Sequence, residues 1–134
     1  MTYILDACAL IAYLTNELGA EFVEKILINT KVNPVIMHKV NLLEIYYGFF
    51  RDYGQEKADE LLKDIPLLDL KIIDGVSDKL FREAGRLKAT YKLSLADAIC
   101  LAQAQISGAT VVSSDHHEFD VIEQHEALNF AWLR

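Results

Sequence analysis

The sequence is poor in proline, cysteine and long apolar runs. Only two prolines, two cysteines and one tryptophan occur among its 134 residues. Cys8 and Cys100 both lie in apolar helical contexts, and a disulfide framework needs more cysteines than these. No apolar run approaches the roughly 18 to 20 residues that span a bilayer. The N-terminus also lacks the basic region of a secretory signal, so we expect a cytoplasmic protein.

Basic residues are also scarce. Lys and Arg number 13 against 20 Asp and Glu, and the net charge of −7 taken alone argues against binding to nucleic acid. The exception is a basic segment, residues 79–92, in which Glu83 is the only acid. This segment is either a solvated helix face or a strip that contacts phosphates. Its candidate contacts are Arg82, Arg86 and Lys88.

Short apolar strands alternate with helical patterns along the chain. Together with a hydrophobic content of 52%, this alternation predicts one α/β domain, residues 1–134, with a parallel sheet covered by helices on both faces. In such folds, ligands bind outside the carboxyl ends of the strands. The expected strands are 2–6, 33–37, 67–73, 110–114 and 127–132. The expected helices are 9–16, 19–30, 40–52, 55–64, a stripe from Val76 to Tyr91, and 95–107, the last one.

Four acids stand within or beside segments that carry no other charge: Asp6, Glu44, Asp97 and Asp115. Asp6 and Asp115 directly follow expected strands. Glu44 and Asp97 lie early in expected helices, whose starts also fall at the carboxyl edge of a parallel sheet. The four carboxylates can therefore converge at one end of the domain.

Converging carboxylates repel one another, and without a cation one or more would take up a proton. A hard divalent cation such as Mg²⁺ or Mn²⁺ prefers carboxylate oxygen and water as ligands. It also polarises phosphoryl oxygens and activates bound water, which suits the hydrolysis of phosphodiesters. The pattern thus predicts a metal site for Mg²⁺ or Mn²⁺.

Each acid also has a purely structural interpretation. The segments "SLAD" (94–97) and "NLLE" (41–44) can be capping boxes, Asp6 can cap the following helix, and Asp115 can be a turn residue. The segment "DHHEFD" (115–120) invites a zinc site, but adjacent His116 and His117 lack the spacing of zinc ligands. No glycine-rich nucleotide motif or serine nucleophile motif is present.

Four segments together resemble the PIN-domain ribonucleases, specifically the VapC-type toxins of bacterial toxin–antitoxin pairs. They are "YILDACALIAYL" with Asp6, "VNLLEIYYG" with Glu44, "LSLADAICLAQA" with Asp97 and "GATVVSSDHHEFD" with Asp115. The resemblance covers essentially the whole chain. It departs after the first acid, where Ala7 and Cys8 replace two small polar residues.

The resemblance implies a three-layer α/β/α fold around a five-stranded parallel sheet, and Mg²⁺- or Mn²⁺-dependent endonucleolytic cleavage of RNA, commonly tRNA or rRNA. Asp6, Glu44, Asp97 and Asp115 would be the catalytic metal ligands, with Glu118 as a further candidate through water. It also implies a homodimer that a small antitoxin inhibits and that binds operator DNA only in complex with this antitoxin.

An alternative function is a catalytically degenerate PIN fold that serves as a protein-interaction module. Its partner surface would use exposed aromatic residues such as Tyr46, Phe49 and Phe50. The replacement of polar residues by Ala7 and Cys8 is the sequence feature that favours it. A phosphoacceptor receiver domain fits the expected sheet but not the acids, because no lysine follows the strand at 110–114.

Overall fold

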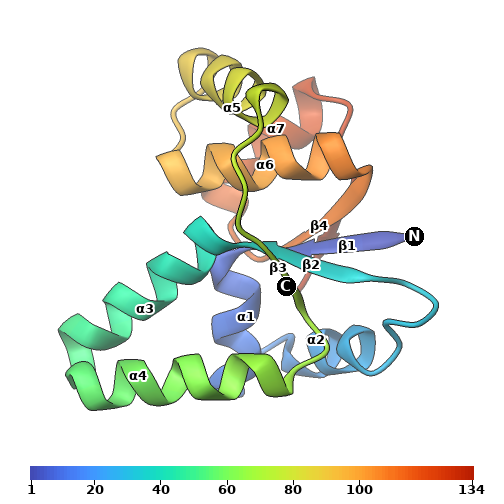
Figure 1. Ribbon diagram of the computed structural model, residues 1–134. Coiled ribbons are helices and arrows are strands. Elements are labelled where there is room, and N and C mark those ends of the chain that lie inside the picture. The colour runs from blue at the N-terminus through green and yellow to red at the C-terminus, as the bar shows by residue number, and fades with distance from the viewer.

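A five-stranded, wholly parallel sheet forms the centre of the computed structural model, which describes residues 1–134 (Figure 1). The strand order is β3-β2-β1-β4-β5, so the chain adds strands on one side of β1 and then on the other. The expectation of a five-stranded parallel sheet is confirmed. The strands are β1 (Thr2–Leu5), β2 (Val35–His38), β3 (Lys71–Ile73), β4 (Ala109–Ser113) and β5 (Phe130–Trp132).

Helices cover both faces of the sheet, as the three-layer α/β/α prediction requires. Helices α5, α6 and α7 lie on one side and α1, α2, α3 and α4 on the other (Figure 1). None of the helices combines the length and apolar character of a membrane span. They are α1 (Ala7–Leu14), α2 (Ala20–Leu27), α3 (Lys39–Tyr53), α4 (Gln55–Asp64), α5 (Asp78–Thr90), α6 (Leu95–Ser107) and α7 (His116–His125), with a 3-10 turn at Ile65–Leu67.

The alternating side chains of the strands divide the apolar residues into two cores. Ile4 and Val111 pack under α5, α6 and α7, whereas their chain neighbours Leu5 and Val112 pack against α1, α2 and α3. Successive side chains of a strand point to opposite faces, so strands buried on both faces must be apolar throughout. This explains why the central strands are nearly free of charge.

Helix α7 is absent from the sequence prediction, whose last helix is 95–107. Residues 116–125 form one more helix, and only Phe119 and Ile122 of this helix are buried. Two buried residues among histidines and acids give only a weak apolar periodicity, so the sequence pattern does not predict this helix. The predicted start of the stripe at Val76 is also wrong, because α5 begins at Asp78 behind the N-cap Ser77.

The start of α3 also differs from the expectation that Asn41 begins a capping box. The N-cap is His38, whose Nδ1 accepts the backbone N–H of Val40 at 3.1 Å. Its Nε2 lies 2.9 Å from the carbonyl oxygen of Gly75, to which it donates. Asn41 is buried in the first turn and donates through Nδ2 to the carbonyl of Ala96 at 3.1 Å. Both contacts fix α3 against neighbouring segments.

We predict that His38→Ala lowers the free energy of unfolding by about 2 to 3 kcal/mol, because it removes a helix cap and leaves the Gly75 carbonyl without its donor. Urea denaturation measures the change. The exposed His125 provides a control, since His125→Ala is expected to shift stability by less than about 0.5 kcal/mol. Equal effects of the two substitutions would contradict the role assigned to His38.

Candidate active site

The four isolated acids lie at the carboxyl ends of three adjacent strands. Asp6 follows β1 and Glu44 lies in α3 after β2, while Asp97 is in the first turn of α6 and Asp115 comes shortly after β4. Strands β1 and β4 are neighbours, although the chain forms β2 and β3 between them. Such a switch point in strand order is where α/β sheets open a ligand crevice.

Asp6 is the most enclosed of the four, with 2% of its surface exposed. Its Oδ1 accepts the backbone N–H of Ala9 at 2.8 Å, and its Oδ2 accepts the hydroxyl of Ser113 at 2.5 Å. Burial raises the pKa of Asp6 to about 6 despite these two hydrogen bonds, which favour the ionised form, and the charges of Asp115 and Glu44 add to the rise. The Asp6 carboxyl group is therefore harder to ionise than that of a free aspartate.

Ser113 connects two of the acids, a role that its place in an apolar strand does not reveal. The side chain is fully buried at the end of β4. While the hydroxyl donates to Asp6, its oxygen accepts the backbone N–H of Asp115 at 2.9 Å. One hydroxyl therefore sets the orientation of the Asp6 carboxylate and the position of the loop that carries Asp115.

Asp97 has the most perturbed carboxyl group of the site. Burial, followed by the charges of Glu44 and Asp6, raises its pKa to about 7, and the hydroxyl of Ser94 opposes the rise. Ser94 is the N-cap of α6 and accepts the backbone N–H of Asp97 at 3.1 Å. The cap predicted from "SLAD" is present, and it holds Asp97 at a helix start that faces the other acids.

Glu44 contributes an oxygen atom without a partner. Its Oε1 is buried and makes no hydrogen bond. Burial raises the pKa of Glu44, the amide of Asn41 opposes the rise, and the charge of Asp115 adds to it. A buried acceptor without a donor is costly, so this oxygen is suited to a cation or a bound donor.

Two of the four acids cap helices and also take part in the acidic site. Asp6 is the N-cap of α1, and Asp115 is the N-cap of α7, where its Oδ1 accepts the N–H of Glu118 at 3.1 Å. The structural interpretations of these two acids as a cap and a turn residue are therefore right for their local contacts. They do not compete with a site, because the helix start stabilises negative charge where the acids meet.

The four acids supply carboxylate oxygen, the ligand atom that a hard divalent ion prefers, but their side chains do not form a tight cluster. No three Asp, Glu, His or Cys side chains are gathered closely enough to hold a metal ion between them. The acids are nevertheless near enough to raise one another's pKa. Carboxylate oxygen is also the type of ligand atom that Mg²⁺ prefers.

Cys8 also lies at the site. Burial raises the pKa of its thiol to about 12, and the charges of Asp6, Asp115, Asp97 and Glu44 add to the rise. The thiol is therefore neutral at physiological pH and far from the state of a nucleophile. Cys100 is fully buried nearby, and neither cysteine forms a disulfide.

The three basic residues of α5 expected to contact RNA have partners within the chain. Arg82 pairs with Asp78 at 2.8 Å, Arg86 pairs with Glu126 at 2.6 Å, and the Lys88 ammonium group donates to the carbonyl of Leu93 at 2.8 Å. These contacts are typical of a solvated helix face. Binding of RNA by Arg82, Arg86 and Lys88 stays a prediction.

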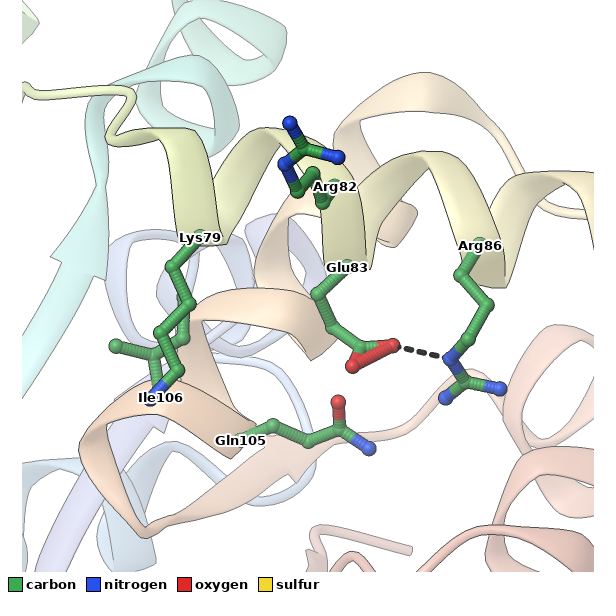
Figure 2. Close-up of a pocket in the computed structure, with 6 residues that line it drawn as sticks. All are labelled: Lys79, Arg82, Glu83, Arg86, Gln105 and Ile106. Carbon is green, nitrogen blue, oxygen red and sulfur yellow. Dashed lines mark hydrogen bonds and ion pairs between the residues drawn. The ribbon is translucent and has the colours of Figure 1, made fainter.

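A pocket of about 320 Å³ between α5 and α6 holds part of this basic segment. Figure 2 shows the side chains of Glu83 and Arg86 side by side on α5, joined by an ion pair and directed towards Gln105, whereas the guanidinium group of Arg82 points away. The pocket reaches Gln105, eight residues after Asp97 in α6, hence roughly 12 Å along the helix axis from the acids. It is separate from the acidic site.

The segment after Asp115 offers no zinc site. The ring of His116 contacts Asp120 through Nδ1 at 2.7 Å and the carbonyl of Arg134 through Nε2 at 2.6 Å, so both nitrogens are occupied. Asp120 is thereby engaged away from the acids, whereas Glu118 is half-buried at the start of α7. Its role as a further metal ligand stays a prediction.

The PIN domain is the family whose model matches the chain, over residues 3–124. No curated protein matches it by sequence. The match spans all four acids and ends one residue before the end of α7.

Several solved structures have the same fold at low sequence identity. A DNA-bound VapBC from Salmonella typhimurium is 16% identical, with a TM-score of 0.76 over 100% of this chain and 99% of that one. VapBC2 from Rickettsia felis, bound to a promoter fragment, is 22% identical, with a TM-score of 0.74 over 98% of each chain. The sarcin–ricin loop cleaving toxin VapC20 from Mycobacterium tuberculosis is 17% identical, with a TM-score of 0.64 over 88% of this chain and 94% of that one.

We predict that Asp97→Asn stabilises the metal-free protein at pH 8 by on the order of 2 kcal/mol, after allowance for the partial exposure of the side chain. A carboxyl whose folded pKa of about 7 exceeds its unfolded value favours folding below pH about 4, and this contribution is lost as the pH rises through 7. Urea denaturation in EDTA at pH 4, 6 and 8 measures it.

The gain from Asp97→Asn is expected to shrink towards pH 4. The matched control is Glu24→Gln, which neutralises an exposed acid on α2. A gain that does not depend on pH would show that Asp97 is not under electrostatic strain.

Proposed function

Because the chain belongs to the PIN-domain family, we propose that it is a metal-dependent endoribonuclease and the toxin of a type II toxin–antitoxin pair. The proposed enzyme is a single nuclease domain, residues 1–134. The observation that carries the proposal is the meeting of four carboxylates from four segments at the switch point of the sheet, where burial and mutual charge raise the pKa of Asp6 to about 6 and of Asp97 to about 7.

Asp6, Glu44, Asp97 and Asp115 are the proposed catalytic residues and would hold one or two Mg²⁺ or Mn²⁺ ions, directly or through water. When bound, such an ion polarises the scissile phosphate and lowers the pKa of a bound water. The unpartnered Oε1 of Glu44 and the carboxylate of Asp6, fixed by Ser113, supply oriented oxygens. We expect hydrolysis to leave a 5′-phosphate and a 3′-hydroxyl.

RNA with single-stranded or looped segments is the proposed substrate, with tRNA or rRNA as the first targets to test. Splayed backbones expose a phosphodiester for in-line attack, whereas a regular duplex shields it. The likeness to the sarcin–ricin loop cleaving toxin from Mycobacterium tuberculosis supports this choice.

The proposed partners are a cognate antitoxin, a second copy of the chain, and operator DNA bound through the antitoxin. The likeness to VapBC complexes, two of them with DNA, supports this. The proposed surface for the antitoxin is a groove of about 370 Å³ between α1, α3 and α4, half of whose lining residues are apolar. Its apolar side chains are Leu14, Phe49, Tyr53 and Leu61.

We predict that the purified chain, freed of any bound partner, cleaves structured RNA in the presence of Mn²⁺ and does not cleave it in EDTA. Asp6→Asn is expected to lower the rate by more than about 100-fold, since even indirect supports of a metal ligand cost about 10- to 100-fold. Gel analysis of end-labelled RNA measures cleavage and identifies the ends. Circular dichroism shows whether the variant stays folded.

The exposed Glu24 serves again as control, because Glu24→Gln removes one negative charge far from β1 and is expected to keep full activity. No cleavage across a broad set of RNAs, with no heat of Mn²⁺ binding by calorimetry, would favour the protein-interaction module instead.

A further inference from the structure

A second groove begins at the acidic site and runs along α3. It encloses about 270 Å³ and is lined by Glu44 and, further along the helix, by Tyr47, Gly48 and Arg51. Its lining also includes Ile11, Thr15 and Glu17, from α1 and the turn after it. Residues three, four and seven positions after Glu44 share its side of the helix. A ligand in this groove would thus extend directly from the proposed reaction centre.

No contact within the chain requires a glycine at position 48. It lies within α3, where glycine is less favourable than alanine. A Cβ atom added there would approach only the Arg51 guanidinium nitrogen, at 4.0 Å, so no neighbouring side chain needs the space. The missing side chain instead leaves bare helix backbone as the floor of the groove between Glu44 and Arg51.

Tyr47 and Arg51 form an exposed pair beside this floor. The guanidinium carbon of Arg51 lies 6.0 Å from the centre of the Tyr47 ring, and 52% of Tyr47 is exposed. Arg51 also donates to both carboxylate oxygens of its chain neighbour Asp52, from Nε to Oδ1 at 2.9 Å and from Nη2 to Oδ2 at 3.2 Å. Both partners of this ion pair are largely solvated, so a phosphate can compete with Asp52 for the guanidinium group.

We propose that this groove binds one nucleotide of single-stranded RNA next to the scissile phosphate, with the base stacked on Tyr47, the backbone on Gly48 and a phosphate at Arg51. The inference rests on the proposed ribonuclease function. Aromatic rings stack on bases of any sequence, and arginine adds bonds to phosphate, which is how proteins hold unpaired strands. Asp52 at the rim offers acceptor oxygens to the amino groups of a base.

The test uses two substrates that differ in their need for the groove. Bis(p-nitrophenyl) phosphate is a small phosphodiester without nucleobases, ribose or flanking phosphates, so its Mn²⁺-dependent hydrolysis reports chiefly on the acidic site. A short single-stranded RNA reports on both. For Tyr47→Ala and Arg51→Ala, we expect KM for RNA to rise about tenfold or more, with hydrolysis of the small ester within about twofold of wild type.

Conservative and control variants separate stacking from folding. Tyr47→Phe keeps the ring and is expected to restore RNA cleavage to within about twofold. Phe81→Ala removes a still more exposed ring from α5, away from the groove, and is expected to change the hydrolysis of neither substrate. Gly48→Ala is expected to weaken RNA cleavage about tenfold while raising the melting temperature by about 4 °C, since alanine favours the helix.

Binding of the same RNA, labelled with fluorescein and measured by anisotropy in EDTA, keeps the inference independent of activity. If the wild type cleaves neither substrate, the proposed function fails, yet weaker binding by Tyr47→Ala and Gly48→Ala would still support the groove. If these variants bind and cleave RNA like the wild type, the nucleotide site is wrong and the groove is left to a protein partner.

Discussion

Burial of several carboxylates beside one another is the constraint under which this fold is built. Asp6, Glu44, Asp97 and Asp115 come from four segments, and each of the first three is harder to ionise than a free side chain. Such an arrangement costs free energy that the two apolar cores must offset. Three of the acids lie at helix starts, where the helix dipole and backbone N–H groups reduce this cost without removing it.

The sheet and the positions of the acids could be predicted from the sequence because the same pattern, apolar strands followed by single charges, reveals both. Strands buried on both faces are apolar throughout, so a carboxylate such as Asp6 at the end of β1 stands out against its neighbours. In a parallel sheet, the residues that directly follow the strands all lie at the same edge, the carboxyl edge. Segment type and position were therefore enough to place all four acids at the same end of the domain.

Contacts between distant residues were not predictable in the same way. Ser113 looks like any small strand residue until β4 is placed beside β1, because its bond to Asp6 joins positions 107 residues apart. Arg86 and Glu126 lie 40 residues apart, and the sequence alone could not show that this arginine already had a partner. The cap of α3 by His38 was missed because histidine is an uncommon N-cap.

The edges of the sheet affect how other chains can bind. The two outer strands, β3 and β5, have three residues each, whereas β4 next to β5 has five. An edge of three residues presents few free N–H and C=O groups, and natural proteins use such short edges against aggregation. Extension of the sheet by a foreign strand is therefore a poor route of association, and a protein partner is directed to the helical faces.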